Sequence, residues 1–243
     1  MNEQKTIVCA HRGASGLVKY ENTIDAFNKA IEVGADSIEC DVRKTKDNVI
    51  VISHNDNVFG NVIKDYTYQE LLDKTSKDGY HLPTLKEALL ACKNKILIDI
   101  EIKEEGYESE IVAQIEEILK TNEFNIRCFY DNSLIEVKKI DPNIFTVLLL
   151  GKDHPSHPVK TRLSEIFPGK RISKTGCNAI SPYFKLVMCN YMARAHKKNC
   201  PVYTWTVKEK DTKELLIQMI HKKHVDGVIT DYPDIAKEVR DKK

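Results

Sequence analysis

Residues 37–54 read SIECDVRKTKDNVIVISH and contain two β-rich runs, 37–43 and 49–53. The connection between them is only five residues long, from Lys44 to Asn48. A parallel return between neighbouring strands needs a crossover of roughly a dozen residues or more. We therefore predict that the two runs pair as an antiparallel hairpin, and this prediction determines how the remaining strands are counted.

Further β-rich runs lie on both sides of the hairpin, and amphipathic helices separate most of them. Asn22 is placed to cap one such helix and Gly34 to end it, and the apolar positions 24, 27 and 31 share its inner face. Strands that alternate with helices indicate a parallel sheet covered by helices. The further runs are 6–10, 96–102, 126–130, 145–150, 178–181, 201–206 and 227–230.

Because 49–53 belongs to the hairpin, eight of the nine runs remain as parallel strands. The predicted fold is an α/β (β/α)8 TIM barrel with a β-hairpin excursion after its second strand. The length of 243 residues agrees with the roughly 250 residues typical of one such barrel. We expect a single domain over 1–243, a small insertion at 55–83 with one short helix near 67–73, and a long irregular loop at 151–177.

Composition excludes some classes of partner. The chain has 37 basic and 36 acidic side chains, a formal charge of +1, which gives no reason to expect nucleic acid. No segment approaches the roughly 20 apolar residues of a membrane span, so we expect no stable membrane insertion. The first residues lack the apolar stretch of a signal peptide, and the seven cysteines form no C-x-x-C pair. A reducing, cytoplasmic location is the expectation.

Ionisable residues gather where the predicted barrel strands end. His11 and Arg12 follow the first strand, Glu39 and Asp41 share one face of the second, and Glu101 lies near the end of another. Lys103 lies on the same face as Glu101. Barrel enzymes carry their active sites at this end, and charges on buried strands are costly unless they are paired or bind a metal.

The hairpin brings a second histidine to the same end. If its turn centres on Asp47 and Asn48, Asp41 lies directly opposite His54, and both side chains are on one face. His54 is then predicted to lie beside the carboxylates. His11 and His54 would act as general acid and general base, one deprotonating the attacking hydroxyl and the other protonating the leaving alkoxide. The sequence does not assign the two roles.

Glu39, Asp41 and Glu101 form an all-oxygen set, which suits one divalent cation, Mg²⁺ or Ca²⁺, better than zinc. A structural ion-pair network with Arg12 or Lys103 is the competing interpretation. With a divalent ion and those two cations the site would carry +1, which a phosphodiester would neutralise. Arg12 and Lys103 suit phosphate binding.

At these residues the chain resembles the glycerophosphodiester phosphodiesterase family. The shared motifs are HRG at 11–13, ENT at 21–23, ECDV at 39–42, TKD at 45–47, His54, LPTLKE at 82–87, EIK at 101–103, TWTV at 204–207 and VDGVITDYP at 225–233. The resemblance implies a (β/α)8 barrel that hydrolyses glycerophosphodiesters to sn-glycerol 3-phosphate and an alcohol with a divalent cation.

The resemblance also implies roles for individual residues. His11 and His54 would be the catalytic pair, and Arg12 and Lys103 would contact phosphate. Trp205 would line the glycerol side, with a core tryptophan as the alternative. The remaining three, which would bind the metal, are Glu39, Asp41 and Glu101.

Two departures from the family pattern keep other functions open. Asn55 follows His54 where the family usually has aspartate, and Lys208 follows TWTV in place of asparagine. The leading prediction is hydrolysis of water-soluble diesters such as glycerophosphocholine or glycerophosphoethanolamine. The alternatives are a lysophospholipase D-like or phospholipase C-like activity on lipids, which would need an apolar rim, and a catalytically impaired barrel that binds a phosphate ligand.

Overall fold

The computed structural model describes residues 5–76, 79–151, 157–207 and 212–242. Its main sheet has the strand order β10-β11-β1-β2-β6-β7-β8-β9, and every neighbouring pair in that order is parallel. The two end strands meet through the parallel bridges Ile180–Val202 and Tyr183–Trp205. The sheet is thus a nearly closed eight-stranded barrel, and the predicted (β/α)8 fold is confirmed.

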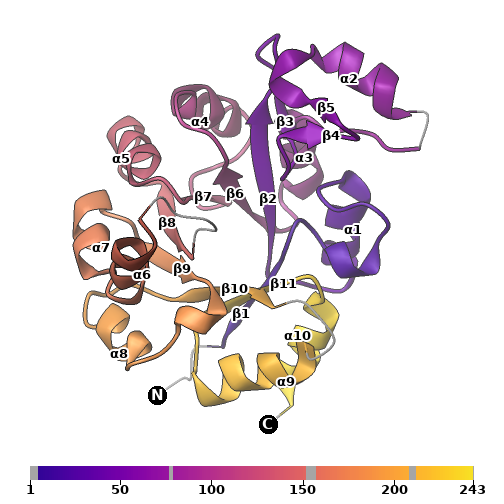
Figure 1. Cartoon of the computed structure of the whole chain (residues 1–243). Coiled ribbons are helices and arrows are strands. Elements are labelled where there is room, and N and C mark those ends of the chain that lie inside the picture. The colour runs from indigo at the N-terminus through magenta and orange to yellow at the C-terminus, as the bar shows by residue number, and fades with distance from the viewer. Residues whose placement is uncertain (1–4, 77–78, 152–156, 208–211, 243) are drawn as a thin grey trace.

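The barrel strands are β1 (Ile7–Ala10), β2 (Ser37–Lys44), β6 (Leu97–Ile102), β7 (Phe124–Cys128), β8 (Phe145–Leu150), β9 (Ala179–Pro182), β10 (Tyr203–Val207) and β11 (Gly227–Thr230). Helices surround them on the outside (Figure 1). These helices are α1 (Ile24–Glu32), α3 (Leu85–Cys92), α4 (Glu108–Glu116), α5 (Asp131–Ile140), α6 (Pro158–Ile166), α7 (Gly169–Thr175), α8 (Tyr191–His196), α9 (Thr212–Ile217) with a π-helical continuation (Gln218–Lys222), and α10 (Pro233–Asp241).

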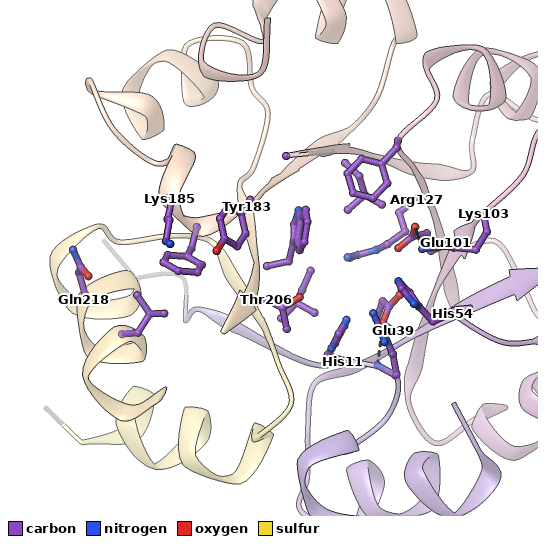
Figure 2. Close-up of a pocket in the computed structure, with 18 of the residues that line it drawn as sticks. His11, Glu39, His54, Glu101, Lys103, Arg127, Tyr183, Lys185, Thr206 and Gln218 are labelled. Atoms are coloured by element: carbon purple, nitrogen blue, oxygen red, sulfur yellow. Dashed lines mark hydrogen bonds and ion pairs between the residues drawn. The ribbon is translucent and has the colours of Figure 1, made fainter. Parts of the chain in front are cut away.

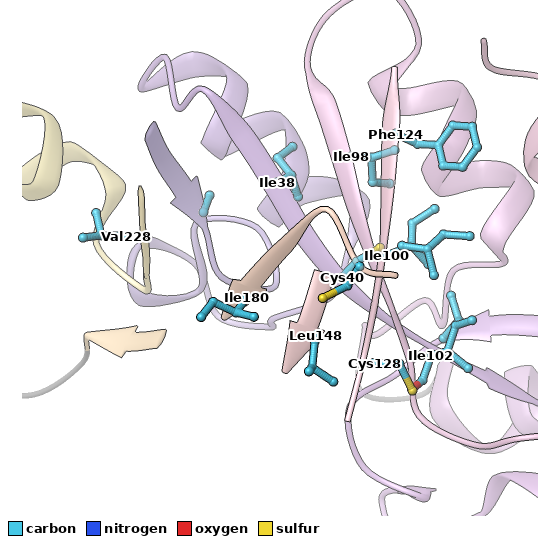
Figure 3. Close-up of a cluster of buried hydrophobic side chains, with 14 of the residues drawn as sticks. Ile38, Cys40, Ile98, Ile100, Ile102, Phe124, Cys128, Leu148, Ile180 and Val228 are labelled. Carbon is cyan, nitrogen blue, oxygen red and sulfur yellow. The ribbon is translucent and has the colours of Figure 1, made fainter. Parts of the chain in front are cut away.

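The hydrophobic core lies between the strands and the surrounding helices. In β2, Ile38 and Cys40 belong to this core, while the alternate residues Glu39 and Asp41 are buried polar groups on the other face. Figure 3 shows Ile38, Cys40, Ile98 and other strand residues in this layer. Burying one such side chain contributes about 1.5–3 kcal/mol, so the outer faces of the strands stabilise the barrel while the inner faces remain available for polar residues.

The predicted hairpin is confirmed, but its predicted register is wrong by one residue. β3 (Ile50–Ile52) pairs antiparallel with β2, and Val42 lies opposite Ile52. Asp41 therefore faces Ser53, whose N–H donates to the Asp41 carbonyl at 2.9 Å. The turn centres on Asp47 alone, because Asn48 takes a left-handed conformation with φ 64°. His54 lies two residues beyond the end of β3.

The insertion at 55–83 packs on the outer hairpin strand. It contains the short strands β4 (Asn57–Val58) and β5 (Asn61–Val62), a 3-10 turn (Ile63–Asp65) and helix α2 (Tyr68–Thr75). Thr67 and Glu70 form a capping box at the start of α2. The buried side chains of the insertion cluster on Val51 of β3 and are Val58, Ile63, Leu71, Tyr80 and Leu82.

The prediction of an irregular loop at 151–177 is wrong, because α6 and α7 lie within this segment. In α6, two apolar side chains face solvent and an acidic one is buried: Val159 is 76% and Leu163 54% exposed, whereas Glu165 is buried. Glu165 accepts a hydrogen bond from the Gly151 N–H at 2.8 Å. Polar tertiary contacts hold this helix, so an apolar stripe facing the core could not reveal it. No helix among the described residues has the length and apolar character needed to cross a bilayer.

Candidate active site

A cavity of about 1040 Å³ opens at the carboxyl ends of the barrel strands. Figure 2 shows His11, Glu39, His54, Glu101 and Lys103 gathered on one side of it, with Lys185 and Gln218 on the other. Seven of the eight predicted site residues line this cavity, and the eighth, Asp41, is buried within ligand distance of two of them. The seven are His11, Arg12, Glu39, His54, Glu101, Lys103 and Trp205.

The HRG turn after β1 places His11 and Arg12. Arg12 and Gly13 both take left-handed conformations, with φ 53° and 77°. A Cβ on Gly13 would lie 2.6 Å from Ala26 of α1, so a side chain has no room there. The Arg12 N–H donates to Glu39 Oε2 at 3.0 Å, and the Gly13 N–H to the Glu39 carbonyl at 3.2 Å. The turn is thereby tied to β2 at the centre of the site.

Asn22 has a role that the sequence did not predict. The predicted cap of α1 is wrong by one residue, because the Thr23 side chain accepts from the Ala26 N–H. Asn22 is instead buried in a left-handed conformation, and its Nδ2 donates to Asp41 Oδ2 at 2.9 Å. The neighbouring Glu21 accepts from Arg12 Nη1 at 2.7 Å. The ENT motif therefore orients both a carboxylate and a cation of the site.

Three carboxylates converge, since Asp41 of β2 lies beside Glu101 of β6 in the parallel register. Ligand oxygens of Glu39, Asp41 and Glu101 lie within 4.8 Å of one another. Burial raises the pKa of Glu39 well above its ordinary value, and the charges of Asp41 and Glu101 add to this. Burial would also raise the pKa of Asp41, but Lys103 and Arg12 lower it below its usual range.

These carboxylates fit a divalent cation. All three are buried and offer only oxygen ligands, and Asp41 Oδ1 accepts no hydrogen bond from the described residues. Lys103 Nζ lies 2.7 Å from Glu101 Oε1 and 3.2 Å from Asp41 Oδ1, and Arg12 Nε lies 3.5 Å from Asp41 Oδ2. Three negative charges therefore face two positive ones, and the raised pKa of Glu39 reflects this excess of negative charge.

Each histidine is oriented by a hydrogen bond at Nδ1. His11 Nδ1 lies 2.5 Å from Asp231 Oδ1, and His54 Nδ1 lies 3.0 Å from Asn55 Oδ1. A carboxylate only accepts, so Nδ1 of His11 carries the proton and Nε2 is left for chemistry. Burial lowers the pKa of His11, against the effect of Asp231. Burial likewise lowers the pKa of His54 to about 4, against the effect of Asp41.

Sequence reasoning missed two further groups of this site. Asp231 follows β11, and its place within the VDGVITDYP motif, which resembles the family, was the available signal. Arg127 of β7 lines the cavity floor and forms a buried ion pair with Asp99 of β6. Arg127 is the one charged residue of its strand, which was a signal that a buried partner exists.

Trp205 forms an apolar wall of the cavity. Its Nε1 donates to the carbonyls of Ser181 at 2.8 Å and Leu150 at 3.1 Å, so its ring edge is fixed to the barrel. Phe129 and Tyr183 pack against its ring with centroids 5.7 and 5.4 Å away. Lys208, the second departure from the family pattern, lies outside the described residues.

Comparison with known proteins identifies the family. Residues 11–235 match the model of the glycerophosphoryl diester phosphodiesterase family. A glycerophosphodiester phosphodiesterase of Caldanaerobacter subterraneus subsp. tengcongensis is 32% identical, over 95% of this chain and 96% of that protein. The crystal structure of the glycerophosphodiester phosphodiesterase from Thermotoga maritima superposes with a TM-score of 0.71 at 27% identity, over 97% of both chains.

A further solved structure shares the fold at lower identity. The phosphodiesterase of Oleispira antarctica, solved in complex with the product sn-glycerol-3-phosphate, superposes with a TM-score of 0.80 at 21% identity, over 98% of this chain and 97% of that one. The resemblance seen in the motifs is thus confirmed along nearly the whole chain. The protein is an enzyme that belongs to the glycerophosphoryl diester phosphodiesterase family.

Proposed function

We propose that this protein hydrolyses glycerophosphodiesters to sn-glycerol 3-phosphate and an alcohol, in a reaction that depends on a divalent cation. One observation carries the proposal: two oriented imidazoles, three buried carboxylates and two cations meet at a single cavity. The Oleispira relative, which binds sn-glycerol-3-phosphate, supports the choice of product.

The phosphodiester binds through positive charge. Arg12 and Lys103 attract its non-bridging oxygens, and Glu21 and Glu101 hold the two side chains by ion pairs of 2.7 Å. A cation held by Glu39, Asp41 and Glu101 would supply further positive charge against the phosphoryl oxygens. Trp205 offers an apolar face to the glycerol carbons.

His11 and His54 perform the proton transfers. One Nε2 accepts the proton of the attacking hydroxyl as the new P–O bond forms, and the other donates a proton to the alkoxide oxygen as the old P–O bond breaks. Asp231 stabilises the charged form of His11. Asn55 fixes the ring of His54 without adding a charge.

Two variants and two substrates test these roles. We expect His11→Ala and His54→Ala each to lower kcat for glycerophosphocholine by about 10²–10⁴ while the circular dichroism spectrum is unchanged. A p-nitrophenyl ester of glycerol 3-phosphate needs no proton on its leaving group, so it should restore turnover in the variant that lacks the general acid. Full activity of either variant on glycerophosphocholine would contradict the assignment.

A second candidate function is hydrolysis of lysophospholipids, and the exposed side chains of α6 favour it. The helix bears Arg162, which lines the cavity, and its exposed Val159 and Leu163 would supply the apolar rim that a lipid enzyme needs. Comparing kcat/KM for lysophosphatidylcholine with that for glycerophosphocholine separates the two functions. Val159→Ser together with Leu163→Ser should lower only the rate with the lipid.

A further inference from the structure

Charge is distributed unevenly along the chain. Residues 157–200, which include α6, α7, β9 and α8, contain nine lysines and arginines but one acidic residue, Glu165. With neutral histidines the formal charge of this segment is +8, and because the whole chain carries +1, the residues outside it carry −7. The net charge of the chain therefore conceals a strongly basic sector, and a local excess of this kind attracts anionic surfaces.

Six of the nine basic residues have no carboxylate partner among the described residues. Arg162 pairs with the buried Glu165, and Arg171 and Lys174 pair with Asp131 of α5. The other six, all exposed except the half-buried Arg194, are Lys160, Lys170, Lys185, Arg194, Lys197 and Lys198. Their positive charge is thus available to a partner outside the chain.

Exposed apolar side chains gather in the same segment. Of the described residues, eight large hydrophobic side chains are exposed, and four of them lie within 157–200. Val159, Leu163 and Phe167 follow one another at intervals of four residues, which places them along one side of α6 and its end. Their exposed fractions are 76%, 54% and 54%. A stripe of this kind is typical of a surface that binds a partner.

The basic and apolar side chains form one continuous surface. Lys160 lies one helical turn from Leu163 on α6. The guanidinium of Arg194 in α8 lies 4.7 Å from the ring centroid of Phe167, and its Nη2 donates to the Ile166 carbonyl at 2.7 Å. Figure 1 shows α6, α7 and α8 side by side on the outside of the barrel. We define the α6 surface by Val159, Lys160, Leu163, Phe167, Lys170 and Arg194.

We propose that the α6 surface binds an anionic lipid membrane, on which the protein docks without crossing it. The apolar side chains enter the boundary between headgroups and acyl chains, and the lysines and Arg194 lie against the lipid phosphates. Docking of this kind needs no membrane-spanning helix. The proposal goes beyond the proposed function and does not depend on it.

The combination of charge and apolar exposure favours a membrane over two other occupants. A second copy of this chain would bring the same excess of positive charge to the interface and be repelled. A nucleic acid would attract the basic residues, but its phosphate backbone offers no apolar surface to Val159 and Leu163. An anionic bilayer offers both a negatively charged surface and an apolar layer beneath it.

The α6 surface adjoins the large cavity at the carboxyl ends of the strands. Arg162, the residue before Leu163, lines this cavity, and Phe184 and Lys185 line it from the 3-10 turn after β9. Figure 2 shows Lys185 on the side of the cavity away from Glu101. A membrane bound at the α6 surface therefore lies beside the wall of the cavity that is opposite the carboxylates.

Sedimentation with vesicles tests the proposal. We expect the wild-type protein to pellet with vesicles of equimolar phosphatidylcholine and phosphatidylglycerol but not with vesicles of phosphatidylcholine alone. Lys160→Glu together with Lys170→Glu should weaken binding by about tenfold or more, because each basic residue near a charged bilayer strengthens binding about fivefold. Val159→Ser together with Leu163→Ser should weaken binding about tenfold through lost apolar contact.

Two control variants make the same changes outside the basic sector. Lys86→Glu together with Lys95→Glu changes two exposed lysines in and just after α3. Leu90→Ser together with Ile140→Ser changes two apolar side chains that are 52% and 43% exposed, on α3 and α5. Neither control should alter the pelleted fraction, and circular dichroism should show the same fold for every variant.

Failure of the wild-type protein to pellet with the anionic vesicles would overturn the proposal. Equal pelleting with phosphatidylcholine alone, or equal losses in the α6 and control variants, would do the same. Binding to duplex DNA in place of the vesicles, or a dimer in sedimentation velocity that Val159→Ser with Leu163→Ser dissociates, would assign the surface to another occupant. Vesicle binding requires no turnover, so an inactive protein that still pellets would overturn the proposed function and leave the membrane surface supported.

Discussion

Asn55 is the residue at which this chain departs from its family beside a candidate catalytic group. Its side-chain oxygen lies 3.0 Å from His54 Nδ1 and orients the ring without a negative charge. Burial, opposed by Asp41, leaves the pKa of His54 at about 4. The substitution therefore keeps the geometry of the imidazole and favours its neutral form, so it does not by itself indicate an impaired barrel.

Asn55→Asp should move the pH dependence of the enzyme. A carboxylate at this position stabilises the imidazolium and raises the pKa of His54, so the limb of the kcat/KM profile that His54 controls should shift to higher pH. Asn28→Asp makes the same change of charge on the exposed surface of α1 and serves as the control. Identical profiles for the wild type and Asn55→Asp would contradict a proton-transfer role for His54.

In the proposed mechanism, Asp231 acts through His11. In Asp231→Asn an amide replaces the carboxylate 2.5 Å from Nδ1, so the imidazolium loses its counter-charge and the required tautomer is no longer enforced. We expect kcat to fall by about 10²–10⁴ while KM changes little. Asp234→Asn, on the exposed start of α10, is the control. If Asp231 had only a structural role, Asp231→Asn would lower thermal stability and leave the kcat of the folded protein unchanged.

At the scale of elements, the packing of the HRG turn against α1 determines where His11 and Arg12 lie. Gly13 and Gly60 both have positive φ, 77° and 82°, but a Cβ on Gly13 meets Ala26 at 2.6 Å whereas one on Gly60 meets nothing within 4 Å. Gly13→Ala should cost roughly 3 kcal/mol of unfolding free energy, from backbone strain and overpacking together, and Gly60→Ala about 1 kcal/mol from strain alone. Urea denaturation measures both; equal losses would show that α1 yields to the added methyl group.

At the scale of the whole molecule, the proposed metal site would couple metal binding to folding. They come from β2 and β6, and in an unfolded chain Glu101 is not held near the other two. A cation at 100 times its dissociation constant should therefore add about 2.7 kcal/mol to the unfolding free energy. Denaturation with Mg²⁺ or Ca²⁺ and with EDTA measures the difference, and Glu39→Gln should abolish most of it.

The same coupling predicts that metal affinity and metal-dependent stability depend on pH. The pKa of Glu39 is raised above its ordinary value by burial and by its two carboxylate neighbours, and metal binding requires the ionised form. As the pH falls through that raised pKa, protons compete with the cation, and affinity and metal-dependent stability should decline together. Titration calorimetry in two buffers of different ionisation enthalpy should show proton release on binding. An affinity independent of pH would contradict a role for Glu39 as a ligand.

Local patterns were sufficient to predict the barrel and most of the charged groups that lie together at its cavity. The five-residue connection after β2 excluded a parallel return, and the alternation of Glu39 and Asp41 with apolar residues placed both carboxylates on one face. Both inferences depend on strand periodicity and connection length, which the sequence contains directly. That these side chains gather at the carboxyl ends of the strands then follows from the barrel fold.

Only the tertiary structure decided the hairpin register, the position of α6 and the contact of Asp231 with His11. The hairpin register depended on one left-handed residue, Asn48, and α6 is held by polar contacts of Glu165 rather than by an apolar inner face. Asp231 and His11 are 220 residues apart in the sequence. They meet because β11 pairs with β1, so the residue that follows β11 lies beside the residue that follows β1. Such contacts are set by barrel closure, which brings distant strand ends to one rim, and periodicity along a single segment carries no information about which ends will meet.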